Sequence, residues 1–337
     1  MTLRYELENP RAFDFTKLDA FADRSVFQTP AWFSFVAATQ RAEPVVASLR
    51  DGGATVGYFT GLVFRKLGMK FLGSPFPGWT TDYMGFNLVP GYPRRKALEG
   101  LRAFAFETLG CVHAEVYDRF VTEEDARAGR FEYGLRPGFE IDLRRDEADL
   151  FKGMDEACRR CVRKAEKSGV MIEEAHDAGF ARDYYAQLED VFAKQSLVPT
   201  YTLGRVSALI EHVLPSGNLL LLRARDKAGR CVATGIFPAF NQRMIFWGGA
   251  SWREHQHLRP NEALMWHAMR HWKARGVAFL DMGGGGDYKR KYGGCDIAVP
   301  WIRTSRFAVL PRLRGLAKSL VDLKHRSLGL ARKWERA

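Results

Sequence analysis

The segment from Asp281 to Gly294 holds the densest group of residues that could do chemistry. It reads Asp-Met, four glycines, and then Asp-Tyr-Lys-Arg-Lys-Tyr-Gly-Gly, directly after a short apolar stretch typical of a buried strand. Glycine lets a backbone approach a ligand closely, and free N–H groups in such a loop can hold an anion or a developing oxyanion. We interpret the segment as a functional loop, and a solvated surface loop is the alternative. It is not a P-loop, because no Lys-Ser/Thr pair closes it.

A second group of charges lies on the helix predicted to end at Lys167. Arg163, Lys164 and Lys167 are part of a polar face that is almost entirely basic. Like charges three and four residues apart repel each other on a helix, and a bound anion would offset that cost. We interpret this face as a contact for phosphate or nucleic acid. A solvated helix face is the alternative.

A loop rich in proline and glycine precedes Trp79, Asp82 and Tyr83. Aromatic and acidic side chains in such a loop suit a substrate pocket, although they also serve as loop anchors. Farther along the chain, residues 311–337 combine a leucine stripe with many Lys and Arg residues. That pattern predicts a basic amphipathic helix suited to an anionic membrane surface or RNA. The alternative is a helix packed on its domain with the basic face in water.

Several familiar chemistries are absent from the sequence. It contains no G-x-S-x-G, no H-E-x-x-H and no G-x-G-x-x-G between a strand and a helix. Cys158 and Cys161 form a C-x-x-C, but no second pair completes a zinc site, so we expect two small buried residues. His267 and His271 are four apart on a predicted helix with no acidic neighbour in the sequence, so we expect packing residues. We predict no metal and no tightly bound cofactor.

The elements that must position these residues fall into two similar series. In the second half, a helix is predicted over 150–167, strands over 218–225, 231–240 and 243–248, a helix over 261–275 and a strand over 277–282. In the first half, strands over 45–49 and 55–64, a helix over 94–109 and a strand over 112–117 follow the same order. This predicts an α/β (α+β) fold with two related domains, each a mixed sheet flanked by helices.

Composition sets the remaining limits. The 337 residues suit two domains, which we place at 1–145 and 146–310, followed by the tail at 311–337. A net charge of +12 favours an anionic partner. Five scattered cysteines indicate reduced thiols. With no signal peptide and no apolar run long enough for a membrane span, we expect a cytoplasmic protein.

Four segments resemble the Fem-like aminoacyltransferases and their GNAT N-acyltransferase relatives. The sequence Tyr288-Lys289-x-x-Tyr292-Gly293 after the glycines is similar to the C-terminal signature of these proteins. Weaker likenesses are Phe27-Gln28-x-Pro30-x-Trp32, the segment from Arg159 to Val170, and Leu258-Arg259-Pro260-Asn261. Together they extend over nearly the whole chain.

The resemblance implies two tandem GNAT domains and transfer of an acyl group from a thioester or an aminoacyl-tRNA ester to an amine. Lys289 falls on the active-site lysine of the family. The implied partners are an anionic small-molecule or tRNA donor and an amine acceptor, in cell-envelope or exopolysaccharide biosynthesis. One departure stands out: where GNAT proteins carry a glycine-containing pyrophosphate loop, this chain has His255 to Pro260 without glycine, which weighs against the ordinary mode of coenzyme A binding.

These considerations give a set of candidate site residues. An amine attacking an activated carbonyl creates an oxyanion and must lose a proton, so we assign Lys289 and the glycine backbone to the first task and Asp287 to the second. The catalytic candidates are Lys289, Asp287 and Tyr288. The substrate-binding candidates are Gly284, Gly285, Gly286, Arg163, Lys164, Lys167, Trp79, Asp82, Tyr83, Trp247, Asn261 and Tyr292. Alternatives are an acetyl-CoA-dependent N-acetyltransferase and a binding module without catalysis.

Overall fold

The computed structural model describes residues 3–193, 197–284 and 286–307. The predicted helix at 311–337 lies outside these residues. Contacts within the chain define two compact units. Unit 1 contains residues 3–137 and 298–307, and unit 2 contains the described residues from 138 to 297. The domain limits given by the sequence stay a prediction. Among the described residues, none of the helices is both long enough and apolar enough to cross a lipid bilayer.

Unit 1 is built on a mixed sheet. Its strands are β1 (Arg4–Leu7), β2 (Glu43–Asp51), β3 (Ala54–Lys66), β4 (Met69–Ser74), β5 (Phe86–Leu88) and β6 (Cys111–Tyr117), joined by parts of β7 (Glu132–Asp142) and β14 (Cys295–Ser305). β1, β2, β3 and β4 pair antiparallel in that order, and β4 runs parallel to β6. β5 pairs with β3, and the end of β14 pairs antiparallel with β6.

Helices cover both faces of this sheet. They are η1 (Phe15–Ala20), η2 (Val26–Gln28), α1 (Pro30–Gln40), α2 (Arg94–Ala103), η3 (Phe104–Thr108) and α3 (Glu123–Ala128). Apolar residues of α2 and η3, such as Leu98 and Phe104, pack with Phe59 and Leu72 of the strands in the main core of this unit. On the other face, Leu18 and Phe21 pack against Tyr58. The predicted helix at 94–109 is confirmed, although its last turn has π-helical geometry.

Unit 2 repeats the arrangement. Its strands are the end of β7, β8 (Met171–Glu174), β9 (Leu219–Arg225), β10 (Cys231–Phe240), β11 (Arg243–Ile245), β12 (Gly248–Ser251) and β13 (Phe279–Gly284). The sheet order is β7-β13-β11-β10-β9-β8, with β12 paired to β10. β11 and β13 are parallel, and the other pairs are antiparallel.

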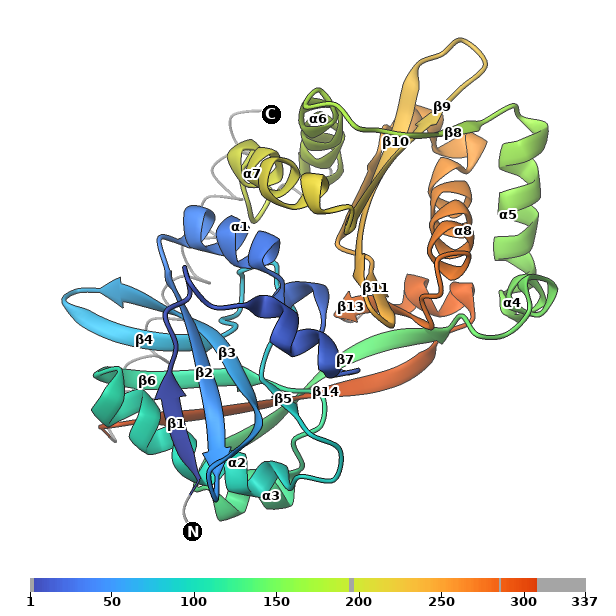
Figure 1. The fold of residues 1–337 in the computed structure, drawn as a ribbon. Coiled ribbons are helices and arrows are strands. Elements are labelled where there is room, and N and C mark those ends of the chain that lie inside the picture. The colour runs from blue at the N-terminus through green and yellow to red at the C-terminus, as the bar shows by residue number, and fades with distance from the viewer. Residues whose placement is uncertain (1–2, 194–196, 285, 308–337) are drawn as a thin grey trace. The chain divides into compact units, whose positions relative to one another are not determined.

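The helices of unit 2 are α4 (Glu147–Gly153), α5 (Glu156–Lys167), α6 (Phe180–Ala193), α7 (Leu203–Val213), η4 (Leu214–Ser216), η5 (Arg253–Leu258), α8 (Pro260–Lys273) and η6 (Asp287–Tyr292). α8 lies between α5 and the strands β9 and β10, while α6 and α7 lie on the other face of these strands (Figure 1). The core contains Leu222 of β9, Phe237 of β10 and Leu264 and Met269 of α8. Leu264, Ala268 and Trp272 recur at helical spacing on α8, so one face of this helix is buried.

The helix predicted over 150–167 is two helices, so that prediction is correct only in part. The backbone adopts an extended conformation at Met154, between α4 and α5. The break frees the N–H of Asp155 to donate to the carbonyl oxygen of Lys291 at 2.9 Å. Gly293 also lies so close to Gly153 that a Cβ on Gly293 would stand 2.6 Å from the carbonyl oxygen of Gly153. The interruption therefore fastens the start of unit 2 to the segment that carries the Tyr-Lys motif.

Candidate active site

The site begins where two parallel strands of unit 2 part. β11 pairs with β13 from Arg243 to Ile245, and the N–H of Phe246 donates to the carbonyl oxygen of Asp281 at 2.8 Å. Beyond that bond, β12 pairs with β10 alone within the part of the chain that the structure describes. The edge of β12 that would face a neighbouring strand is thus open. A pocket of about 320 Å³ lies beside it.

The register of β12 shows which backbone groups face this open edge. The N–H of Trp252 donates to the carbonyl oxygen of Val232 on β10, next to the Ala233–Ser251 pair. In an antiparallel ladder this bond makes Ala233–Ser251 a non-hydrogen-bonded pair, and hydrogen-bonded and non-hydrogen-bonded pairs alternate along the strands. The N–H groups of Gly249 and Ser251 therefore point away from β10, toward the pocket. Two peptide N–H groups at an open edge can bind a carbonyl oxygen or an oxyanion.

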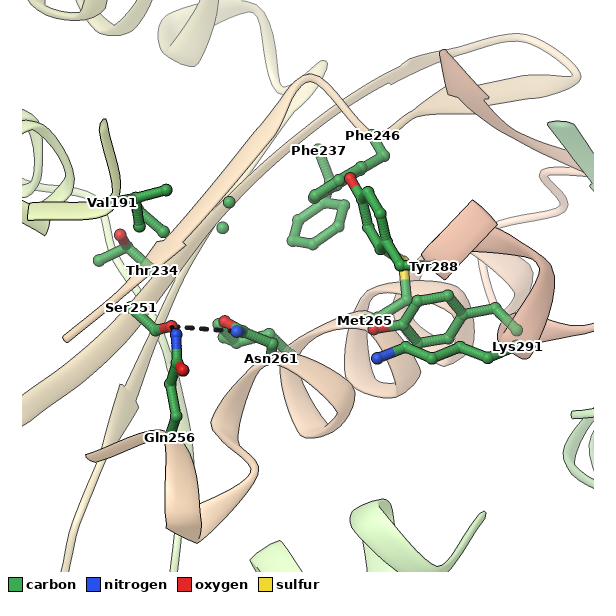
Figure 2. A pocket seen from close by; sticks show the side chains of 15 residues that line it. Val191, Thr234, Phe237, Phe246, Ser251, Gln256, Asn261, Met265, Tyr288 and Lys291 are labelled. Atoms are coloured by element: carbon green, nitrogen blue, oxygen red, sulfur yellow. Dashed lines mark hydrogen bonds between the residues drawn. The ribbon is translucent and has the colours of Figure 1, made fainter. Parts of the chain in front are cut away.

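The pocket is mostly apolar, with polar groups at its margin, as is usual for small-molecule sites. α8 contributes Asn261, whose amide nitrogen donates to the hydroxyl of Ser251 at 3.0 Å (Figure 2). Tyr288 and Lys291 enter from η6, while Thr234 and Val191 lie on the opposite side. The lining is completed by Gly235, Phe237, Phe246, Gly249, Ala250, Gln256, Leu264, Met265 and Tyr292.

Three residues of η6 have distinct surroundings. The ammonium of Lys291 pairs with the carboxylate of Glu262 on α8 at 2.7 Å, and Glu262 is itself buried. Tyr292 is buried beneath them, and burial raises the pKa of its hydroxyl well above the ordinary value, so the phenol stays protonated. Tyr288 is 57% exposed and reaches the pocket with a polar tip. η6 thus contributes a cation already paired with a carboxylate, a buried phenol and an accessible phenol.

Lys289 is buried, with 7% of its surface exposed. Its ammonium donates to the carbonyl oxygens of Met282, at 2.6 Å, and Gly284. Both carbonyl oxygens lie at the end of β13, where the N–H of Gly283 also donates to the carboxylate of Asp281 at 2.8 Å. Gly283 has a φ of 70°, which favours glycine. Lys289 therefore fixes the backbone at Met282 and Gly284 by hydrogen bonds.

Other predicted residues surround this loop or stand apart from it. The carbonyl oxygen of Gly284 accepts from Lys289, and a Cβ on Gly286 would stand 3.0 Å from the ring of Tyr288. Gly285 lies outside the described residues. The side chain of Asp287 is fully exposed, 3.8 Å from Arg290. Trp247 packs on the ring of Tyr201, with 5.2 Å between centroids.

The basic residues of α5 lie on its exposed face. Lys164 and Lys167 are exposed, and Arg163 lies over the ring of Phe151, 5.3 Å from its centroid. These three are in unit 2, but they do not line the pocket described above. Their role as an anion contact stays a prediction.

Three predicted residues belong to unit 1. Trp79 is buried in an aromatic group with Phe64 and Phe76. Asp82 forms an ion pair with Arg136, and Tyr83 is buried against Phe27, with 5.3 Å between the ring centroids. In this unit they are packed side chains, and the structure leaves their assignment to substrate binding a prediction.

The sequence interpretation missed Gly249 and Ser251. The signal was present in the run Gly248-Gly249-Ala250-Ser251, four small residues after Phe246 and Trp247. Small residues in a strand often mark a close approach of a ligand to the backbone. The strand predicted over 243–248 ended at the first residue of this run, and it lacked the break that separates β11 from β12.

Comparison with known proteins identifies the fold. Residues 153–291 match the family model of the acetyltransferase (GNAT) domain, so this part of the chain is a GNAT domain. The crystal structure of FemX superposes with a TM-score of 0.71 at 12% identity, over 88% of this chain and 96% of FemX. The predicted α/β fold of tandem GNAT type is confirmed.

Two further structures share the fold. A tandem GNAT protein from the clavulanic acid biosynthesis pathway has a TM-score of 0.52 at 12% identity, over 90% of this chain and 98% of that one. The C-terminal domain of a putative lysylphosphatidylglycerol synthetase from Agrobacterium fabrum has a TM-score of 0.52 at 8% identity, over 94% of this chain and 97% of that one. No curated protein sequence matches the chain. At these identities the likeness concerns the fold alone.

Proposed function

We propose that this protein is an N-acyltransferase that moves an acyl or aminoacyl group from an activated carbonyl onto an amine, in the pocket of unit 2. One observation carries the proposal: the edge of β12 is open beside the pocket, and Gly249 and Ser251 direct their N–H groups toward it. The GNAT match over residues 153–291 supports the reaction class.

The backbone of β12 is suited to the charge that develops during acyl transfer. When an amine attacks a thioester or an ester, the carbonyl oxygen gains negative charge. The N–H of Gly249, on an exposed residue at the strand edge, donates to that oxygen. Because β12 is held to β10 by its other edge, the donor is already oriented and needs no reorganisation. We therefore propose Gly249 for the oxyanion role that was predicted for Lys289 and the glycine backbone.

The residues of η6 complete the proposal. The hydroxyl of Tyr288 lies at the pocket and donates a proton to the leaving sulfur or oxygen. The amine nitrogen must lose a proton after attack, and Asp287, whose carboxylate is solvent-exposed, accepts it. Lys289 holds the carbonyl groups of Met282 and Gly284 at the end of β13, and it acts as a positioning residue.

The donor is one of two classes, acyl-CoA or aminoacyl-tRNA. The first turn of α8 borders the pocket, and a helix N-terminus favours a phosphate group. Both donors carry phosphate. The turn η5 that precedes α8 has no glycine, which favours aminoacyl-tRNA over coenzyme A. An acetyl-CoA-dependent N-acetyltransferase is the second candidate, because the family model that matches residues 153–291 is that of an acetyltransferase domain.

We place the acceptor in cell-envelope or exopolysaccharide biosynthesis, in the cytoplasm. The resemblance of the Tyr-Lys motif to the Fem-like aminoacyltransferases supports the envelope, and so does the fold shared with a putative lysylphosphatidylglycerol synthetase, a protein named for a phospholipid. The exposed basic face of α5 suits an anionic donor or acceptor, and the segment 311–337 suits an anionic membrane surface.

The test uses the full-length chain. Thermal unfolding is recorded with acetyl-CoA, with a long-chain acyl-CoA and with a pool of aminoacyl-tRNA, because a ligand of the folded state raises the melting temperature. Mass spectrometry of molecules that co-purify from cells then supplies candidate acceptors for turnover. We expect one donor class to stabilise the protein and to be consumed. A protein that binds its ligand without turning over any donor would be a binding module instead.

A further inference from the structure

Two histidines and one glutamate of unit 2 meet outside the pocket. His267 and His271 are one turn apart on α8, and Glu174 is the last residue of β8, 97 residues from His271 along the chain. The sequence offered the histidines no acidic neighbour, and the fold supplies one. The Nδ1 atom of His271 is 2.8 Å from a carboxylate oxygen of Glu174, and the Nε2 atom of His267 is 3.8 Å from the same oxygen.

The spacing of these atoms suits a metal ion. One ligand atom from each of the three side chains lies within 4.8 Å of the other two. Zinc binds imidazole nitrogen and carboxylate oxygen at about 2.0–2.2 Å, which separates the ligand atoms of a tetrahedral ion by roughly 3.4 Å. The observed distances of 2.8 and 3.8 Å lie on either side of that value. Small side-chain rotations would therefore bring all three atoms to one ion.

The three side chains are partly buried but remain accessible to an ion from solvent. The side chain of His271 is 9% exposed, while those of His267 and Glu174 are 35% and 38% exposed. Both imidazole rings direct a nitrogen toward the same carboxylate oxygen of Glu174, and a neutral imidazole binds metal through such a nitrogen. Arg270 and Arg275 are the cations nearby, and Arg275 is occupied with the carbonyl oxygen of His271 at 3.1 Å.

We propose that Glu174, His267 and His271 form a binding site for a first-row divalent metal ion, with Zn²⁺ as the ligand that the donor set suits best. Two imidazoles and one carboxylate leave at least one coordination position to water. The ion would link the end of β8, at the edge of the sheet, to the middle of α8. It would thus brace the helix whose first turn supplies Asn261 to the pocket.

The experiment measures binding rather than turnover. The full-length chain is freed of metal with a chelator and titrated with ZnCl₂ by calorimetry and with CoCl₂ by visible absorption. We expect saturable binding of one ion, a melting temperature that rises with zinc concentration, and visible cobalt bands of a four- or five-coordinate site. His271→Ala should weaken zinc binding at least tenfold, and the double variant His267→Ala/His271→Ala should remove it.

A matched variant separates this site from general surface binding. His176→Ala/His212→Ala also removes two histidines of unit 2, but it leaves the three proposed ligands intact, so zinc binding should be unchanged. If His271→Ala fails to fold, Glu174→Gln replaces it as the ligand variant. The proposal is overturned if zinc and cobalt do not bind, or if His267→Ala/His271→Ala binds zinc as the wild type does. It is also overturned if cobalt shows a thiolate charge-transfer band from cysteine ligands.

Discussion

The two units share one order of elements, but they differ at the junction where two parallel strands of the sheet separate. In unit 2, the parallel strands β11 and β13 separate, β12 turns to pair with β10, and a pocket lies at the divergence. In unit 1, the parallel strands are β4 and β6, and β5 turns to pair with β3 in the same manner. There, protein groups fill the equivalent junction.

In unit 1, backbone and side-chain groups from several segments form hydrogen bonds across the junction. The N–H of Met84 donates to the carbonyl oxygen of Tyr117 at 3.2 Å. The buried carboxylate of Asp118, directly after β6, accepts the N–H of Phe86 at 2.9 Å and pairs with Arg94 at 3.0 Å. The amide of Gln28 donates to the carbonyl oxygen of Met84 at 2.9 Å. These bonds satisfy the backbone that unit 2 leaves open.

The comparison shows how one topology serves two purposes. After the last parallel strand, unit 1 places Asp118, a side chain that closes the junction, whereas unit 2 places glycines around Lys289 and keeps the junction accessible. We infer that unit 1 contributes stability at this position and that unit 2 contributes chemistry. Four experiments test that division.

The largest effect is expected for Lys289→Ala. The substitution removes the ammonium that binds the carbonyl oxygens of Met282 and Gly284, so the glycine loop loses its internal support. Transfer should be abolished, while the protein stays folded with a loss of about 1–3 kcal/mol in unfolding free energy. Turnover and urea unfolding measure the two quantities. Full activity in this variant would remove Lys289 and its loop from the site.

Gly249→Pro removes the proposed oxyanion donor without removing a bond of the ladder to β10. Loss of one such donor lowers kcat by about 10²–10³-fold. Gly249→Ala is the matched control, because it keeps the N–H; its Cβ would stand 3.1 Å from the ring of Phe246, which must shift slightly. Equal kcat values for the two variants would mean that the N–H has no part in catalysis.

Asp118→Ala tests the closed junction of unit 1. It removes the buried carboxylate that accepts the N–H groups of Phe86 and Phe120. Among the described residues, Arg94 then retains its ion pair with Asp23. We expect the unfolding free energy to fall by about 3 kcal/mol, the low end of the cost of breaking a buried pair. Donor affinity should change little. A variant of normal stability with impaired donor binding would reverse the roles assigned to the units.

The smallest effect is a difference in thiol labelling. Burial raises the pKa of Cys111 in unit 1 to about 11 and that of Cys158 in unit 2 to about 12. At pH 8 both pKa values lie above the pH, so both thiols stay protonated and react slowly, while the exposed Cys295 reacts at once. Mass spectrometry identifies each labelled site. Asp118→Ala should speed labelling of Cys111 and leave Cys158 unchanged, and equal acceleration at both would show that the units open together.

The sequence predicted the fold better than it predicted the details of the site. The helices predicted over 94–109 and 261–275 correspond to α2 with η3 and to α8. The strands predicted over 45–49 and 55–64 correspond to β2 and β3. The short strand β5 has three residues and depends on its partner β3, so no local pattern predicted it. The break at Met154 was not predicted either, because Leu150, Met154 and Cys158 continue at helical spacing across it.

Within the candidate site, the sequence could not assign roles to the polar groups of the segment after β13. Lys289 and Lys291 are both cations of the same short segment, and only the fold gives one of them backbone carbonyls and the other Glu262. The N–H groups of Gly249 and Ser251 carry no side-chain signal at all. Their direction depends on the register between β12 and β10, which is a tertiary property.

The path of the chain has a consequence for how this molecule can be divided. Residues 298–307 belong to unit 1, where Trp301 to Ser305 pair with β6, although the whole of unit 2 precedes them in the sequence. Within the described residues, unit 2 is therefore inserted between two parts of unit 1, and the backbone passes between the units near residues 137 and 297. A fragment that stops at Ile297 would deprive β6 of a neighbouring strand, so an excision aimed at one half would expose a sheet edge in the other.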